Sequence, residues 1–193
     1  MNKIEFIKKE FGNHFTDVST AWEPEVEHDN LLYKGRQTHC RSGLYTFVRM
    51  LKAKYVLEIG SWCYNGSHYM GKAMDAEGID GRVDSIDIMP GGFGGEKIDM
   101  NTINKRVKPY YWMPHHTPYD DWKYTADIVH PEFRNMTDVE IYERNIKWLK
   151  SIAPENGYDL IMIDGDHSYI GIKWDWKYVN EVCHNETVIV IDD

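Results

Sequence analysis

Acidic residues and a histidine follow a short apolar segment in the C-terminal third of the chain. Residues 160–163 are all apolar, and Asp164, Asp166 and His167 come directly after them. Carboxylates are the ligands that hard divalent cations prefer, and histidine exchanges a proton near neutral pH. The segment therefore predicts a buried strand whose exit loop could bind a cation or transfer a proton.

A second acidic pair, Asp192 and Asp193, follows another apolar segment at 187–191. If the two segments are neighbouring strands of a parallel sheet, their carboxyl ends lie side by side. Asp164, Asp192 and Asp193 could then converge on one cation such as Mg²⁺.

A glycine-bounded loop lies in the first half of the chain. It runs from Gly60 to Gly66 and follows an apolar segment that carries Glu58 near its end. A strand, a glycine turn and a helix form the arrangement in which α/β proteins bind nucleotides. Asp87, at the end of the next predicted strand, is placed to accept hydrogen bonds from ribose hydroxyls.

The elements that must position these residues alternate between strand and helix. Hydrophobic periodicity predicts helices at 3–11, 42–52, 68–76, 137–152 and 172–182, and strands at 55–59, 82–88, 107–113, 159–163 and 187–191. Thr137 and Glu140 form a capping box, Ser168 is the expected N-cap of the last helix, and Trp176 is expected in the core.

This alternation predicts an α/β fold with a Rossmann-like, doubly wound, mainly parallel sheet that has helices on both faces and ends after its fifth strand. We expect one domain over residues 1–193. Residues 1–40 would form an N-terminal helix and loop extension. Residues 90–135 would form an aromatic-rich insertion that lines an acceptor pocket or packs as ordinary core.

Composition narrows the possible functions. The net charge of −9 opposes nucleic-acid binding through phosphate contacts. The three cysteines, Cys40, Cys63 and Cys183, show neither a disulfide framework nor a zinc motif. With no signal peptide and no membrane-length apolar run, we expect a cytoplasmic protein that acts on a small molecule.

The segment from Val56 to Gly60, with Gly66 and Ser67 after it, resembles motif I of the class I S-adenosylmethionine-dependent methyltransferases. The resemblance implies that Glu58 meets the amino group of S-adenosylmethionine and that Asp87 meets its ribose. The implied cofactor-binding residues are Glu58, Gly60, Ser61, Gly66, Ser67 and Asp87. In that family the second glycine usually follows sooner. A nicotinamide-binding fold shares these features, but its G-x-G-x-x-G pattern is absent.

The segment from Asp164 to His167, followed by Tyr169, resembles the metal-dependent small-molecule O-methyltransferases of the macrocin and cephalosporin hydroxylase-like group. In that group an acid after the fourth strand and a pair after the fifth bind the metal. The resemblance covers roughly residues 40–193 and implies Mg²⁺ at Asp164, Asp192 and Asp193. It also implies that His167, three positions after the first acid, is the general base.

The expected function is S-adenosylmethionine- and Mg²⁺-dependent methylation of a hydroxyl of a small molecule. The alternative is a non-catalytic S-adenosylmethionine-binding module or partner subunit. Class I methyltransferases add two strands after the fifth, so an apolar edge at 188–191 could pair with a second copy in a homo-oligomer. A purely structural interpretation makes the glycine loop a tight turn, Asp164 and Asp166 helix caps, and Asp192–Asp193 a solvated end.

Overall fold

The computed structural model describes residues 5, 9–12, 38–61, 64–88, 100–112 and 135–192, with side chains described from residue 43 onward in the helix that begins at Thr38. Within these ranges there are five strands: β1 (Tyr55–Ile59), β2 (Arg82–Asp87), β3 (Val107–Tyr111), β4 (Tyr158–Ile163) and β5 (Cys183–Ile191). The main helices are α2 (Thr38–Leu51), α3 (Asn65–Ala76), α5 (Asp138–Ile152) and α6 (Tyr169–Asn180).

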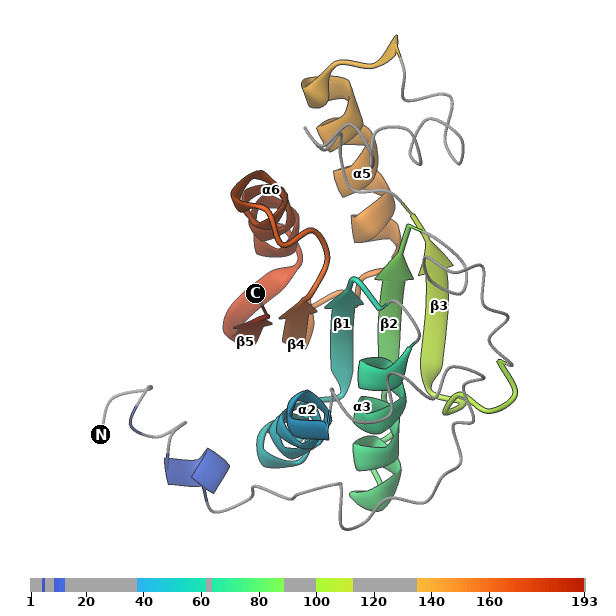
Figure 1. Cartoon of the computed structure of the whole chain (residues 1–193), viewed down its shortest axis with the longest axis vertical. Helices are drawn as coiled ribbons and strands as arrows, with labels where there is room; N and C mark the ends of the chain where they lie inside the picture. Colours follow the sequence, from blue (N-terminus) through green and yellow to red (C-terminus); the bar gives the residue numbers. More distant parts are fainter. Residues whose placement is uncertain are drawn as a thin grey trace.

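The strands form one parallel sheet in the order β3-β2-β1-β4-β5 (Figure 1). Consecutive parallel strands need crossover connections, and α3, α5 and α6 supply those from β1 to β2, from β3 to β4 and from β4 to β5. The order reverses between β1 and β4, which is where open α/β sheets bind ligands. The predicted Rossmann-like, doubly wound sheet is thus confirmed.

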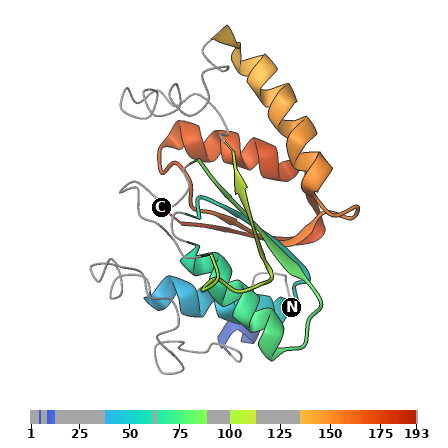
Figure 2. The same cartoon turned by 90° about the vertical axis from the view of Figure 1, so that its right-hand side faces the viewer.

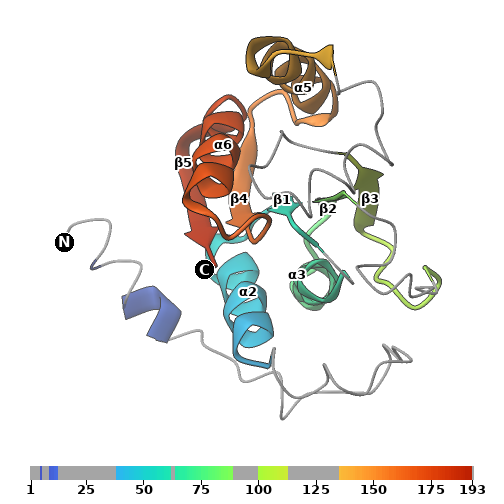
Figure 3. The same ribbon diagram turned by 45° about the horizontal axis from the view of Figure 1, so that its top comes forward.

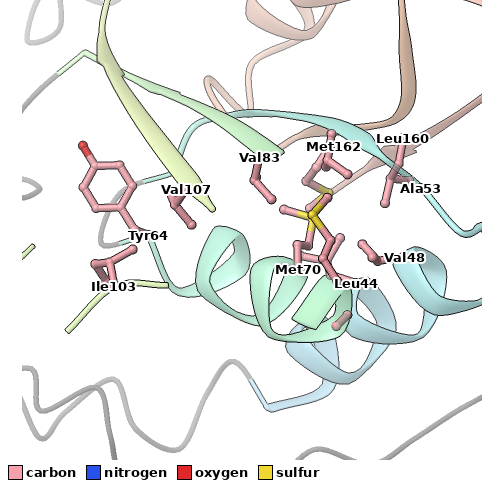
Figure 4. Packing of buried hydrophobic residues seen from close by; sticks show 13 residues of the cluster. Leu44, Val48, Ala53, Tyr64, Met70, Val83, Ile103, Val107, Leu160 and Met162 are labelled. Carbon is pink, nitrogen blue, oxygen red and sulfur yellow. The ribbon is translucent and has the colours of Figure 1, made fainter. Parts of the chain in front are cut away.

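Helices cover both faces of the sheet (Figure 2). On one face α2 packs against β4, and α3 packs against β2 and β3 (Figure 3). Their shared core includes Val48, Met70, Val83, Leu160 and Met162 (Figure 4). We call this the α2/α3 face. On the other face, α5 and α6 cover a second core. Its strand residues alternate along each strand with those of the first core.

Strand register decides which side chains meet at the carboxyl edge of the sheet. Glu58 lies between Ser85 of β2 and Met162 of β4. Side chains alternate between faces along a strand, so residues two positions beyond a core residue of the α2/α3 face lie on that same face. The acidic residues at the carboxyl ends of these strands therefore lie on one face of the sheet.

The helix starts follow the sequence signals. The capping box of α5 is present, since Thr137 accepts a hydrogen bond from the Glu140 N–H and Glu140 accepts one from the Thr137 N–H. Met136 packs against Ile141, which adds a hydrophobic staple to the capping box. The Ser168 side chain accepts a hydrogen bond from the Gly171 N–H and so caps α6.

Several element bounds differ from the sequence-based prediction. Helix α2 begins four residues earlier than expected, α3 three residues earlier and β5 four residues earlier. Strand β3 ends two residues earlier than the strand predicted at 107–113 within the aromatic-rich segment, and it pairs with β2 in the sheet. Of the predicted N-terminal helix, residues 5 and 9–12 are described and helical, and the Phe11 ring packs on Phe47 at 4.8 Å.

The prediction for Trp176 was wrong, because 44% of this residue is exposed. The inner face of α6 is formed by Gly171, Asp175, Tyr178 and Val179, at helical spacing. Trp176 lies about 100° around the helix from Asp175 and so points away from the core. Trp174 packs against that core instead.

Among the described residues, no helix is long and apolar enough to cross a membrane.

Candidate active site

Four acidic residues come together at the carboxyl edge, on the α2/α3 face. Each lies an even number of residues beyond a core residue of this face on the same strand, so its side chain lies on the same side of the sheet. The four are Glu58, Asp87, Asp164 and Asp192. The Asp164 N–H donates to the Ile59 carbonyl at 2.8 Å, and the Asp192 N–H donates to the Ile163 carbonyl at 3.0 Å. These bonds extend the sheet ladder by one residue and bring the exit loops of β1, β4 and β5 side by side.

Gly60 is required by the packing of two of these loops. Its φ is +84°, and a Cβ atom on it would lie 2.0 Å from the Asp164 carbonyl oxygen. No larger residue fits there without moving the backbone of the β4 exit loop. The glycine expected from motif I is therefore needed by the protein itself, independently of any ligand.

Glu58 is buried beneath the first turn of α3 and is 3% exposed. Its Oε2 accepts hydrogen bonds from the Ser67 hydroxyl and from the Ser85 hydroxyl, the latter at 3.0 Å. A Cβ atom on Gly66 would lie 2.1 Å from Glu58 Oε1, so the second glycine makes room for this carboxyl group. The predicted residues Glu58, Gly66 and Ser67 thus form one cluster.

The electrostatics of Glu58 follow from its burial. Burial raises the pKa of its carboxyl to about 7, while the two serine hydrogen bonds oppose the rise and Asp164 and Asp87 add to it. Glu58 therefore changes charge near neutral pH. A cation that reached this carboxyl would favour its ionised form.

Ser61 supplies an unused polar group in the same loop. The residue is 5% exposed, and its hydroxyl has no hydrogen-bond partner within the part of the chain that the structure describes. Its N–H donates to the Ile86 carbonyl at 3.3 Å, which holds the loop against the end of β2. Burying a hydroxyl without a hydrogen-bond partner destabilises the folded protein, and a ligand that bonds to the hydroxyl would remove this cost. This loop therefore suits a polar ligand.

Asp164 and His167 lie within ion-pair distance in the exit loop of β4. His167 Nε2 is 3.3 Å from Asp164 Oδ1, and about half of the His167 side chain is exposed. Burial raises the pKa of Asp164 to about 6, Asp192 raises it further, and His167 opposes the rise. The acid and the base that the sequence predicted are therefore brought together.

Asp166 has a structural role in the turn before α6, although the N-cap of this helix is Ser168. Its Oδ1 accepts a hydrogen bond from the Ser168 N–H at 2.9 Å, which shapes the turn before α6. Gly171 must lack a side chain, because a Cβ atom there would lie 2.5 Å from Asp166 Cβ.

Two of the three predicted metal ligands, Asp164 and Asp192, are among the described residues. Asp164 and Asp192 are neighbours, and their like charges raise the pKa of Asp164, which a bound cation would reverse. Asp193 lies outside the described residues. Within the described ranges no group of three histidine, cysteine or acidic residues is placed to hold a metal ion.

Sequence reasoning missed three residues of this region. Ser85 reads as one polar residue inside a buried strand, and its bond to Glu58 depends on the pairing of β1 with β2. Asp175 is fully buried on α6, with neither side-chain oxygen hydrogen-bonded to a described residue, and burial raises the pKa of its carboxyl to about 8. Its spacing from Gly171 and Val179 on the inner face of α6 was the available signal. Tyr64 is the third missed residue.

Comparison with known proteins identifies the family. The sequence matches a family model described as a methyltransferase domain over residues 57–193. A comparison with curated proteins finds no match. Similar solved structures include the O-methyltransferase TomG from Streptomyces achromogenes in complex with S-adenosylmethionine. It has a TM-score of 0.53 and 11% identity over 98% of this chain and 70% of TomG.

Two further structures have similar folds. An O-methyltransferase from Bacillus cereus in complex with S-adenosylhomocysteine has a TM-score of 0.52 and 13% identity, covering all of this chain and 67% of its own. MycE, from the mycinamycin biosynthetic pathway, in complex with Mg and S-adenosylhomocysteine, has a TM-score of 0.50 and 15% identity over 91% of this chain and 38% of MycE. The chain therefore belongs to the methyltransferase domain family and has the Rossmann-like fold of the class I enzymes.

Proposed function

We propose that this methyltransferase transfers a methyl group from S-adenosylmethionine to a hydroxyl group of a small molecule, with the help of a divalent cation. The observation that carries this proposal is the convergence of the Gly60–Gly66 loop with Asp87, Asp164 and Asp192 on one face of the carboxyl edge. In open α/β sheets ligands bind at this edge, where the strand order reverses.

The loop after β1 and the end of β2 would hold the cofactor, which supplies an activated methyl group when bound. Glu58 in its ionised form would attract the cofactor's positively charged amino group, and Asp87 would accept hydrogen bonds from its ribose hydroxyls. The buried Ser61 hydroxyl, which has no hydrogen-bond partner among the described residues, supports a polar ligand at this loop. TomG and the Bacillus cereus enzyme were solved with S-adenosylmethionine and S-adenosylhomocysteine, respectively.

Asp164 and Asp192, together with Asp193, would hold a cation such as Mg²⁺. When bound, such a cation lowers the pKa of an acceptor hydroxyl. The chemistry of the donor set supports this assignment, since carboxylate oxygens suit a hard cation and the adjacent Asp164 and Asp192 charges repel each other without one. MycE was solved with Mg.

His167 would take the proton from the acceptor hydroxyl. Asp164 Oδ1 lies 3.3 Å from His167 Nε2 and favours the tautomer with its hydrogen on Nε2, which leaves Nδ1 to accept a proton. The same carboxylate stabilises the imidazolium that forms. This arrangement gives the proton a destination beside the acidic pair.

The experiment combines binding and turnover. Wild-type protein should bind S-adenosylmethionine in calorimetry. With Mg²⁺ and a panel of catechol, sugar and polyketide alcohols, it should release S-adenosylhomocysteine at a rate that chelator abolishes. His167→Ala should lower kcat about 10²- to 10⁴-fold, because it removes a general base, and should leave cofactor affinity within about twofold.

The matched control is His184→Ala. His184 lies at the opposite end of the sheet, where its Nε2 is 3.4 Å from Asp159, and its replacement should leave kcat unchanged. Loss of cofactor affinity together with kcat in His167→Ala would indicate a structural role for His167. Absence of cofactor binding by the wild-type protein would contradict the proposed function as a whole.

A further inference from the structure

Tyr64 has an unusual backbone conformation in the loop proposed to bind the cofactor. Its φ of 59° and ψ of 17° place it in the left-handed region, which is sparsely populated by bulky residues. It occupies the N-cap position of α3, and its side chain makes no capping hydrogen bond. Such a backbone conformation costs free energy and persists only where the surrounding structure enforces it, often at functional sites.

Packing accounts for the ring of Tyr64 but leaves its hydroxyl unexplained. The residue is 1% exposed, and its ring belongs to the core cluster that contains Ile103 and Val107. Figure 4 shows the ring beside these two side chains, with the hydroxyl pointing away from both. A phenylalanine would fill the same space without the free-energy cost of burying a hydroxyl.

The hydroxyl makes no hydrogen bond to any residue that the structure describes. Burial raises the pKa of the Tyr64 phenol, and the Tyr111 hydroxyl adds to the rise together with Asp87 and Glu58. Tyr64 therefore stays protonated and keeps a hydrogen to donate.

The neighbours of the hydroxyl place it at the ribose side of the proposed cofactor site. Asp87 and Tyr111 are paired across β2 and β3 at the last rung of the ladder. Asp87 is the residue assigned to the ribose hydroxyls, and an ionised carboxylate can only accept hydrogen bonds. A nucleoside also carries acceptors, on its ribose oxygens and ring nitrogens, and these need a donor.

We propose that Tyr64 binds the nucleoside part of the cofactor by donating a hydrogen bond from its phenolic hydroxyl. This inference rests on the proposed function and adds to it a donor that complements the acceptor Asp87. It assigns a role to a residue that stands in a left-handed turn between the two glycines of the loop.

The test is Tyr64→Phe, which keeps the ring and removes only the hydroxyl. Calorimetry would measure binding of S-adenosylhomocysteine and of 5′-methylthioadenosine, which has the nucleoside but lacks the amino-acid part. Loss of one hydrogen bond should weaken both ligands by the same factor, about three- to tenfold. The thermal midpoint of the ligand-free variant should equal or exceed that of wild type, because the described residues offer this hydroxyl no hydrogen-bond partner to lose.

Tyr158→Phe is the matched control. Its buried hydroxyl donates to Asp84 Oδ2 at 2.8 Å, on the opposite face of the sheet. This variant should lose thermal stability and keep wild-type affinity for both ligands. Tyr64→Phe should thus lose ligand affinity and keep its stability, whereas Tyr158→Phe should lose stability and keep its affinity.

Three results would overturn the inference: unchanged affinity of Tyr64→Phe for both ligands, weakened binding of S-adenosylhomocysteine alone, or a loss of stability like that of Tyr158→Phe. The second would place the contact at the amino-acid end of the cofactor, and the third would reveal a partner within the protein. Failure of the wild-type protein to bind either ligand would instead contradict the proposed function, and this inference with it.

Discussion

Glu58 shows how a single buried side chain links stability, pH and ligand binding. It has hydrogen bonds from two serines, yet burial raises its pKa to about 7. The two serine bonds stabilise the ionised form only in part, because they replace a full hydration shell. A positive ligand group would supply the missing stabilisation, which is why ligand-free protein and complex should respond differently to pH.

The pKa of Glu58 predicts a pH dependence of stability. Between its ordinary pKa of 4.5 and about 7, the folded protein holds this proton more tightly than the unfolded chain does. The free energy of unfolding should therefore fall as pH rises through that window, by on the order of 3 kcal/mol from this residue. Urea denaturation of Glu58→Gln at pH 5 and pH 8 should show a shallower decrease than wild type.

The exposed residue Glu155 provides the control for this measurement. Glu155→Gln removes the same charge from the chain and should keep the wild-type decrease between the two pH values. Equal slopes for wild type and Glu58→Gln would show that Glu58 is ionised in the folded protein throughout this range.

At the scale of elements, the contact between the exit loops of β1 and β4 sets the shape of the site. Gly60→Ala should destabilise the fold by about 2 kcal/mol or more, because its Cβ would overlap the Asp164 carbonyl and its φ is positive. Gly78→Ala is the control. Its φ is +65° with nothing within 4 Å of the added Cβ, so only the backbone cost of about 1 kcal/mol remains.

Urea unfolding of both variants separates the two contributions. A Gly60→Ala protein no less stable than Gly78→Ala would mean that the β4 exit loop moves aside at little cost. In that case the loop that carries Asp164 and His167 would be mobile relative to β1.

The elements themselves were largely predictable from sequence, because their signals are local. All five strands and the caps of α5 and α6 follow from hydrophobic periods and capping residues. The start of α3 was not predictable. The chain turns at Tyr64, which has a left-handed conformation. A sequence pattern would instead assign such a conformation to one of the two glycines on either side of it.

In the candidate site, too, the features that follow from local sequence signals were predictable, and those that depend on tertiary packing were not. The adjacency of Asp164 and Asp192 follows from the pairing of two consecutive parallel strands, which the sequence implied. The burial of Glu58 depends on Ser67 and Ser85, which come from two other elements. Its neutral-range pKa therefore required the packed structure.

At the scale of the whole molecule, the acidic edge predicts a response to cations. If Asp164 and Asp192 bind Mg²⁺, saturating Mg²⁺ should stabilise the fold by about 2.7 kcal/mol at a hundredfold excess over Kd. For a chain of this size that corresponds to a rise in Tm of roughly 5–10 °C. Scanning calorimetry should show the rise in wild type and in Asp80→Asn, whose carboxylate is fully exposed away from this edge.

Asp164→Asn should lose most of this Mg²⁺-induced rise, because it removes one ligand of the proposed site. The ligand-free variant is itself expected to be no less stable than wild type, since the repulsion with Asp192 disappears. A rise of equal size in Asp164→Asn would show that Mg²⁺ stabilises the protein elsewhere.

The two-residue alternation that carries four acids to one face of the sheet also limits how this chain can change in length. Deleting one residue within β4 would turn Asp164 to the α5/α6 side and expose Met162 and Leu160 to the wrong core. Insertions in the segments that connect the elements leave this parity intact. Variation in length among functional descendants of this chain should therefore be confined to the connections, while each strand keeps its residue count.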